Sequence, residues 1–252
     1  MFGRSSIELF WKRQRKHQKS ARESVVDMFE AFYADYVSAL KNNTIGVEAA
    51  WKCPLQCPFC ARQRDEDKFL IDIAKDMPLD DMHKMLKTIK NMNLCGQISD
   101  PIYHEDFLSV MQVISQYPDR KFTINTNGTA KKLTWWKEVY DLSHENVKWV
   151  FGLDGIDQET ANKHRVNTKF NDVMKAMILG AKMGKRIEWQ FIVFKHNEDQ
   201  IPRAINIAKR YNLKLKLLKS YRWDPIIMQK TGIEQPSPKW VSSSQDSEKV
   251  VI

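Results

Sequence analysis

Three of the four cysteines in this chain of 252 residues lie within eight consecutive positions, at Cys53, Cys57 and Cys60. Thiolates this close together, on a loop this short, can bind a single metal centre. A structural zinc ion normally takes four protein ligands, and a cubane iron–sulfur cluster is normally held by four thiolates. A cubane held by only three cysteines has one iron open to a further ligand, and an open iron is a catalytic feature.

A zinc site is the alternative interpretation of the same loop. Cys95, His83 or His104 could supply a fourth ligand, and a Cys-x2-Cys pair is often a zinc motif. Zinc ribbons and fingers, however, use two separated pairs, whereas this chain has one compact trio. On this interpretation the protein is a zinc-stabilised, basic nucleic-acid-binding module that uses residues 12–19, KRQRKHQK, on phosphates.

The composition limits the partners and the compartment. The balance of 40 Lys and Arg against 31 Asp and Glu gives a formal charge of +9, which favours anionic partners, nucleic acid among them, although a solvated basic surface is the simpler interpretation. Four cysteines, three of them crowded together, are poor material for disulfides, so we expect a reducing compartment, the cytoplasm. The sequence lacks the pattern of a secretory signal and any apolar stretch long enough to span a bilayer, so we expect no membrane partner.

Short apolar runs alternate with longer amphipathic ones from residue 45 onward. The expected strands are 45–50, 94–98, 121–125, 147–153, 187–194 and 213–218, and the expected helices are 78–92, 105–117, 131–141, 169–184 and 198–211. This alternation predicts parallel βαβ units with right-handed crossovers. Six units are too few for a closed eight-fold barrel, so an incomplete barrel or an open doubly wound sheet remains. In both folds the loops at the carboxyl ends of the strands carry the chemistry.

The chain divides into three parts. Residues 1–44 are expected to be a helical extension, because 22–40 place apolar side chains on one helical stripe. Residues 45–222 form the expected barrel. Residues 223–252 are rich in Pro, Ser and charge and are expected to be a tail with little core of its own.

The order Cys-x3-Cys-x2-Cys, with Phe59 directly before Cys60, resembles the signature of the radical S-adenosylmethionine (radical SAM) superfamily. The resemblance implies that Cys53, Cys57 and Cys60 hold a [4Fe-4S] cluster whose fourth iron chelates the amino and carboxylate groups of SAM, with Phe59 beside the cofactor. It also implies a partial six-stranded barrel with the cysteine loop after the first strand, in agreement with the strand order above. The expected fold is therefore α/β, a TIM-like partial (β/α)6 barrel, and a flavodoxin or ferredoxin is the implied electron donor.

The loop after the second expected strand, LCGQISDPIYHEDF, resembles the family segment that contacts the SAM ammonium. Aligning the end of the segment puts Asp100 where the family has glutamate, whereas aligning the glycines puts Gly96 and Gln97 there. We favour Asp100, together with Gly96 or Ser99, because a carboxylate gives an ammonium group a charge-assisted hydrogen bond. A plain turn with Asp100 as its cap is the alternative.

Three further strand ends offer candidate cofactor contacts. Asn125 and Thr126 begin a turn that resembles the family's Thr-Asn-Gly, although an ordinary Asn-Gly turn explains the sequence as well. Asp154 lies in FGLDGID, which is similar to the family's Ser-(Leu/Val)-Asp-Gly with Gly152 in place of the serine. Gln190 is the polar exception on a largely apolar strand and is a candidate for the ribose, with a hydrogen-bonded core amide as the alternative.

The resemblance implies an enzyme that reductively cleaves SAM to a 5′-deoxyadenosyl radical, which abstracts hydrogen from a substrate. The strand-two and strand-four motifs are similar to those of enzymes that modify peptides or build cofactors, so a peptide, protein or cofactor precursor is the favoured substrate. The extra cysteines of auxiliary clusters are absent after Cys95, which leaves a nucleotide or small metabolite open. Residues 221–223 either close over the site or plug the unfinished barrel.

Overall fold

Six parallel strands in chain order form the framework of the protein. The computed structural model describes residues 43–63, 75–96, 98–220, 223–241 and 249–251. The strands are β1 (Thr44–Val47), β2 (Asn91–Leu94), β3 (Lys121–Thr126), β4 (Val147–Gly152), β5 (Arg186–Ile192) and β6 (Lys214–Leu218), with a seventh, β7 (Lys249–Val251), antiparallel to β6. Each parallel strand pairs with the next one along the chain. This order confirms the partial (β/α)6 barrel, because an open doubly wound sheet would reverse its strand order.

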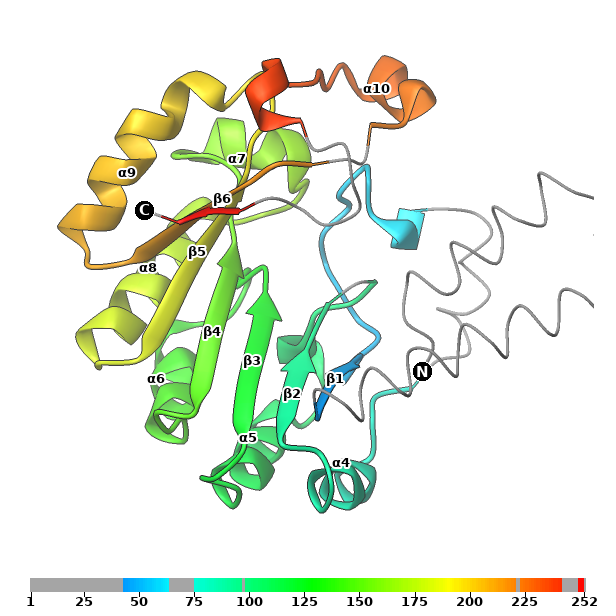
Figure 1. Cartoon of the computed structure of the whole chain (residues 1–252), viewed down its shortest axis with the longest axis vertical. Coiled ribbons are helices and arrows are strands. Elements are labelled where there is room, and N and C mark those ends of the chain that lie inside the picture. Colours follow the sequence, from blue (N-terminus) through cyan, green and yellow to red (C-terminus); the bar gives the residue numbers. More distant parts are fainter. Residues whose placement is uncertain (1–42, 64–74, 97, 221–222, 242–248, 252) are drawn as a thin grey trace, which may run out of the picture.

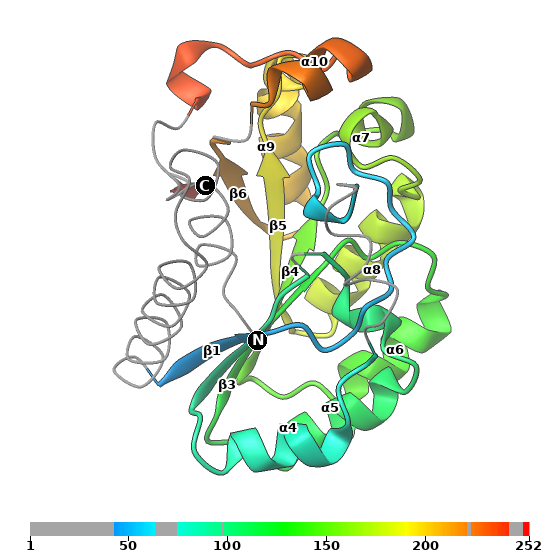
Figure 2. The same cartoon turned by 90° about the vertical axis from the view of Figure 1, so that its right-hand side faces the viewer.

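Helices connect the strands and lie on one side of the sheet (Figures 1 and 2). They are α4 (Leu79–Leu86), α5 (Phe107–Ser115), α6 (Leu133–Asp141), α7 (Gln158–His164), α8 (Phe170–Lys182) and α9 (Ile201–Arg210); a further helix, α10 (Pro225–Thr231), follows β6. Short 3-10 turns occupy Ala61–Gln63, Pro101–Tyr103, Glu198–Gln200 and Pro238–Trp240. None of the helices in the described ranges is long and apolar enough to cross a membrane.

Large aromatic side chains fill the layer between the sheet and the helices. Trp149 and Phe151 point from β4 toward α6, where they meet Trp136 and Tyr140, and all four are fully buried. The ring centroids of Tyr140 and Trp149 lie 5.6 Å apart, and those of Trp136 and Phe151 lie 5.2 Å apart. Aromatic pairs at this spacing add to the stabilisation from burial alone. The helix-facing side of the sheet is therefore the main core.

The second strand lies earlier in the chain than the sequence predicts. It covers Asn91–Leu94 instead of 94–98, and α4 ends at Leu86 instead of continuing to residue 92. Only Met92 and Leu94 of this strand face the core, while Asn91 and Asn93 face the opposite side and are half-buried. Because one face of the strand is polar, the strand lacks the continuous apolar run that marks a strand buried on both faces.

The segment after β6 contributes more packing than the sequence suggests. Ile233, just after α10, is buried in a small apolar cluster with Phe59 and Phe194, and Trp223 and Met228 pack against it. In Figure 1 α10 lies at the carboxyl-end side of the strands, above β6. The expected N-terminal helix at 22–40 and the basic run at 12–19 lie outside the described residues.

Candidate functional site

The cysteine loop follows β1 at the carboxyl edge of the sheet and is tied to the segment after α7. The Gln56 amide donates to the Val166 carbonyl at 3.1 Å, and the Asn167 side chain donates to the Pro54 carbonyl at 3.3 Å. Within the loop, the Cys60 amide donates to the Cys57 carbonyl at 3.0 Å, which closes a turn. The loop thus has a fixed path between β1 and the end of α7.

The four cysteines all lie within the described residues, form no disulfide there and are only partly buried. The Asn127 amide group lies 3.7 Å from Cys53 Sγ. Burial raises the pKa of Cys53 to about 12, and the nearby Asp100, Cys57 and Cys60 add to the rise. Burial also raises the pKa of Cys57 to about 12, although the Arg165 guanidinium opposes it. The three sulfurs of the motif are therefore within electrostatic reach of one another.

The residues considered as a fourth zinc ligand have other partners. His104 Nε2 donates to the Met77 carbonyl at 2.9 Å, and its Nδ1 accepts from the Asp106 amide at 3.0 Å. His83, on α4, contacts the Tyr117 hydroxyl at 3.1 Å. The Cys95 thiol lies 3.8 Å from the Val47 carbonyl. Within the described ranges no three His, Cys, Asp or Glu side chains surround one metal position, and this includes Cys53, Cys57 and Cys60. The zinc interpretation gains no support, because its three candidate fourth ligands have other partners.

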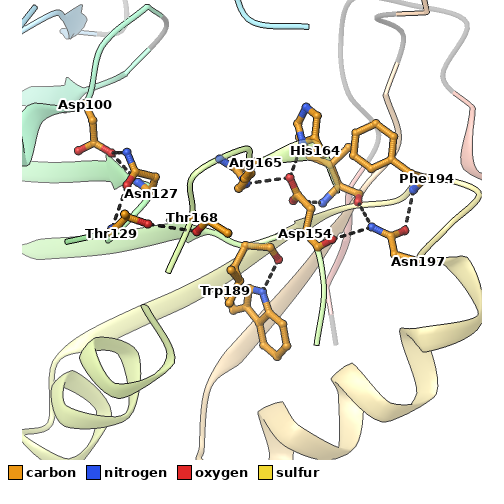
Figure 3. Close-up of polar contacts among 12 residues, drawn as sticks. Asp100, Asn127, Thr129, Asp154, His164, Arg165, Thr168, Trp189, Phe194 and Asn197 are labelled. Atoms are coloured by element: carbon orange, nitrogen blue, oxygen red, sulfur yellow. Dashed lines mark hydrogen bonds and ion pairs between the residues drawn. The ribbon is translucent and has the colours of Figure 1, made fainter. Parts of the chain in front are cut away.

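Asp100 is a buried carboxylate that joins the ends of β2 and β3. Its oxygens accept from the Asn127 backbone and side-chain amides, both at 2.5 Å, and from the Thr126 hydroxyl at 2.9 Å. It also caps the short 3-10 turn by accepting from the Ile102 amide at 3.2 Å. Burial raises the pKa of Asp100 to about 6, although these hydrogen bonds oppose the rise. The capped turn considered from the sequence is present, and Figure 3 shows Asn127 beside the carboxylate.

Gly96 and Ser99, the other candidates for the SAM ammonium, lie in contact with each other. A Cβ on Gly96 would lie 2.2 Å from the Ser99 carbonyl oxygen, so only glycine fits. The Ser99 hydroxyl donates to Glu48 Oε2 at 2.5 Å. Gln97, the alternative to Asp100, lies outside the described residues.

Asp154 is the centre of a second buried polar group, drawn in Figure 3. His164 Nδ1 donates to Asp154 Oδ2 at 2.7 Å, and Arg165 Nε forms an ion pair with the same oxygen at 2.8 Å. The Ile192 amide donates to the other carboxylate oxygen at 2.8 Å. Burial works to raise the pKa of Asp154, but the Arg165 charge and the His164 hydrogen bond outweigh it and hold the pKa below its ordinary value.

Gly152 makes room for the Arg165 guanidinium. A Cβ at Gly152 would lie 2.5 Å from Arg165 Nη2 and 2.6 Å from its Cζ. A serine at this position, as in the family pattern, would displace the arginine. The guanidinium therefore lies against the carboxyl end of β4, between Asp154 and the cysteine loop.

An aromatic cluster covers the end of β5 beside the last cysteine. The rings of Phe59 and Phe194 are stacked with centroids 6.4 Å apart, and Trp223 contacts both rings edge-on. His164 lies 4.5 Å from Phe194 between ring centroids. Phe59 is thus held in an apolar wall that continues into the segment around α10.

Asn125 and Gln190 lie on the side of the sheet that faces away from the helices. The Asn125 amide donates to the Leu94 carbonyl at 3.4 Å. Gln190 is half-buried and pairs with Gly152 in the strand register.

Comparison with known proteins identifies the family. The model of the Radical SAM superfamily matches residues 52–208, more than half of the chain. The chain belongs to the radical SAM superfamily. The match covers the cysteine loop, the strands from β2 to β5 and most of α9.

Solved structures share the fold of this radical SAM protein. SuiB from Streptococcus suis bound to precursor peptide SuiA gives a TM-score of 0.55 at 16% identity, covering 79% of this chain and 45% of that chain. The protein anSMEcpe with bound AdoMet and a peptide gives 0.52 at 19% identity, covering 72% of this chain and 51% of that chain. The chain thus spans about half the length of these structures. A search of curated protein sequences gives no significant match.

The cofactors of radical SAM enzymes are a [4Fe-4S] cluster and SAM, and the donor set at this site fits them. Three cysteine thiols on one loop are the number of protein ligands that a cubane with one open iron requires. The positive charge of Arg165 beside Cys57 favours the thiolate form that an iron ligand requires. The Asp100 carboxylate lies within electrostatic reach of Cys53, and the Arg165 guanidinium lies within electrostatic reach of Cys57.

Two residues of this radical SAM site are absent from the sequence-based candidates. Asn127 belongs to the Asn-Gly turn already singled out, so its signal was present in the motif. Arg165 follows α7, a helix that the sequence pattern did not predict, and no motif marks it. Its position depends on the contact with Asp154, which lies eleven residues earlier in the chain.

Proposed function

We propose that this enzyme reductively cleaves SAM at its [4Fe-4S] cluster to a 5′-deoxyadenosyl radical, which abstracts hydrogen from the substrate. The observation that supports this proposal most directly is the three-cysteine loop after β1, in a chain whose family match begins at residue 52. The cluster and SAM supply the radical chemistry, and the chain's own residues bind, orient and shield them.

Cys53, Cys57 and Cys60 would hold the cluster, and Asp100 would accept a hydrogen bond from the SAM ammonium. Asp100 already organises the turn at Thr126 and Asn127, so its carboxylate is fixed before SAM binds. Gly96 would contribute its backbone to the same end of SAM, while the Ser99 side chain is engaged with Glu48.

Arg165 would pair with the SAM carboxylate. The guanidinium of Arg165 packs against Gly152 and forms an ion pair with Asp154. These two contacts orient the guanidinium before any ligand binds. Asp154 would then act as a positioning residue, because it reaches SAM through Arg165. Gln190, beside Gly152 in the register, would reach the ribose, and Phe59 would provide an apolar surface next to the cluster. Asn125 would line the same concavity.

The favoured substrate is a peptide, a protein or a cofactor precursor. The solved structure of SuiB contains a precursor peptide and that of anSMEcpe contains a peptide, which supports a peptide substrate for this chain. A nucleotide or small metabolite is the alternative. A flavodoxin or ferredoxin would supply the electron, and the use of three of the four cysteines in one metal-binding motif supports a reducing compartment, the cytoplasm.

Replacing Cys57 by Ala tests the proposal. Removing one of three cluster ligands should abolish both the brown colour of the anaerobically purified protein and the release of 5′-deoxyadenosine from SAM under reduction. Iron and sulfide content, the visible spectrum and chromatography of the nucleoside product measure the two effects.

Cys95→Ala is the matched control, because Cys95 is the one cysteine outside the motif. It should retain colour and SAM cleavage. Cleavage that survives Cys57→Ala, or colour that is lost equally in both variants, would contradict the assignment of the loop.

A further inference from the structure

The side of the sheet that faces away from the helices carries charged residues in the middle of its strands. Side chains alternate between the two faces of a strand. Because Trp149 and Trp189 point to the helices, Lys148 and Glu188 point to the opposite, concave face. The interior of a closed (β/α) barrel is normally filled by branched apolar side chains. The concave face here is built differently from a packed barrel core.

Four cations gather on this face around one carboxylate. In the register, Lys148 on β4 pairs with Arg186 on β5, and Glu188 pairs with Lys214 on β6. Lys216 Nζ lies 3.3 Å from Glu188 Oε1, and Lys214 Nζ lies 3.8 Å from Glu188 Oε2. We call these five described residues, Lys148, Arg186, Glu188, Lys214 and Lys216, the cationic cluster; its four cations and one carboxylate give a net charge of +3.

The low exposure of Glu188 and Lys216 distinguishes this part of the cluster from an ordinary solvated surface, whereas Arg186 and Lys214 are exposed. The side chain of Glu188 is 5% exposed and that of Lys216 is 16% exposed, whereas Lys214 is 57% exposed. Burial lowers the pKa of Lys148, and the charges of Lys216, Arg186 and Lys214 lower it further, against the opposing effect of Glu188. A partly buried ammonium among like charges is stabilised when an anion joins it.

The position of the cluster relates it to the site above. Gly152, which contacts Arg165, lies four residues beyond Lys148 on the same strand. Four residues of parallel strand span about 13 Å. The cluster thus lies on the same concave face as Gln190. Along the strands it is about 13 Å from the carboxyl ends, where the cysteine loop lies.

We propose that the cationic cluster binds an anionic group, a carboxylate or a phosphate, of the enzyme's substrate. This inference rests on the proposed function. It describes an extended substrate whose anionic group lies about 13 Å from the end that meets SAM. Lys148 is the principal contact, because Lys214 and Lys216 already share Glu188, and the ammonium and the anion form a charge-assisted hydrogen bond.

Calorimetric titration of the cluster-loaded enzyme tests the site, with inorganic phosphate and succinate as probes. Saturating SAM is present so that the open iron is occupied. We expect one saturable site, and Lys148→Met should weaken binding about tenfold, as expected for loss of a hydrogen bond to a charged group. Lys182→Met, which removes an exposed lysine on α8, is the control and should bind like the wild type. The tighter of the two probes tells a phosphate from a carboxylate substrate.

Glu188→Gln should change the affinity in the opposite direction. Removing the one described carboxylate of the cluster frees Lys214 and Lys216 for the probe, so binding should tighten. If this variant does not fold, the comparison of Lys148→Met with Lys182→Met is sufficient to test the anion site.

The anion site would be overturned if the wild type, Lys148→Met and Lys182→Met bound the probes with equal affinity. It would also be overturned if both variants lost affinity equally, because that result indicates nonspecific attraction. Release of 5′-deoxyadenosine by the wild type is measured separately. A wild type that cleaves SAM but whose anion binding does not depend on Lys148 refutes this inference alone. A wild type that binds the probes through Lys148 but does not cleave SAM refutes the proposed function alone.

Discussion

Arg165 joins two parts of the site that are distant in the sequence. Its guanidinium neutralises Asp154 and lies against Gly152, while its charge acts on Cys57. Asp154 is fully buried and Arg165 is mostly buried, with side-chain exposures of 0% and 15%. A buried charge whose partner is removed is much more costly than the loss of an exposed ion pair.

Arg165→Met should lower the free energy of unfolding by about 3–5 kcal/mol, because it leaves the Asp154 carboxylate buried without its cation. It should also weaken SAM binding in the loaded enzyme. Urea unfolding of the cluster-free chain and equilibrium binding of SAM measure the two effects. Lys137→Met breaks an exposed ion pair with Asp141 on α6 and should change stability by no more than about 1 kcal/mol. An equal cost for the two variants would contradict the buried role of Arg165.

The proposed contact between the buried carboxyl of Asp100 and the SAM ammonium predicts that SAM binding depends on pH. Its pKa is raised to about 6, so the group is ionised at neutral pH and gains a proton as the pH falls through that value. The neutral acid cannot give the SAM ammonium a charge-assisted bond. One pH unit below the pKa, SAM affinity should therefore be about tenfold lower than at neutral pH.

Anaerobic binding of SAM across this pH range measures the effect, with Asp100→Asn measured alongside. The variant has no carboxyl group to titrate at this position, so its weaker affinity should not change near pH 6. A wild-type affinity that stays constant through this pH would show that another group meets the ammonium.

The positions of residues that belong to short local motifs could be predicted from the sequence, and the roles of these residues stay predictions. The cysteine trio and Asp100 lie at the carboxyl ends of β1 and β2, as a strand-and-motif analysis predicts. The role of Arg165 could not be predicted, because its environment is made by Gly152 and Asp154 through the fold and not by neighbouring sequence. The concave position of Lys148 likewise depends on the register of three strands.

At the scale of elements, the short helix α7 positions the residues that lead into the site. Asp157 caps it by accepting from the Thr160 amide at 2.8 Å, and His164 and Arg165 stand at its other end. The helix has only seven residues, so it depends on its cap and on tertiary contacts more than a long helix does.

Asp157→Ala should cost about 1 kcal/mol of stability, as expected for loss of an N-cap, and should also weaken SAM binding by loosening Arg165. Thermal unfolding and SAM binding are measured together. Asp106→Ala removes the comparable cap of α5, where the carboxylate accepts from the Ser109 amide. It should lower the melting temperature without a change in SAM affinity, and a fall in affinity with this control would argue against a specific role for α7.

The sequence predicted the helices and strands whose apolar residues follow a clear helical or strand repeat, and it missed or displaced the others. Strands β3 to β6 and helices α5, α6, α8 and α9 lie within a few residues of their expected positions. Strand β2 was displaced because its concave face is polar, and α7 and α10 are too short to establish a helical repeat. The strand order followed from the βα alternation, since right-handed crossovers leave few alternatives.

At the scale of the whole molecule, the partial barrel ends in an apolar closure between the cysteine loop and the segment after β6. Phe59 precedes Cys60 directly, and its ring packs on Phe194 and Trp223. Ile233 fills the same cluster with 4% of its surface exposed, although it lies far along the chain in a region rich in proline and charge. The burial of Ile233 could not be predicted from composition, because it comes from contacts with Phe59 and Phe194, which are distant in the sequence.

Ile233→Ala tests whether this closure protects the cluster. Deleting a buried isoleucine side chain should cost about 2–5 kcal/mol of stability. The cavity loosens Phe59, so water and oxygen should reach the cysteine loop more easily and the brown colour should fade faster in air. Urea unfolding measures the first effect and the decay of visible absorbance measures the second. Ile226→Ala removes the same side chain from α10 at a position that is 77% exposed, and it should change neither. Of the two isoleucines, only Ile233 contacts the apolar wall beside Cys60. Fading at the same rate in both variants would therefore mean that other parts of the chain shield the cluster.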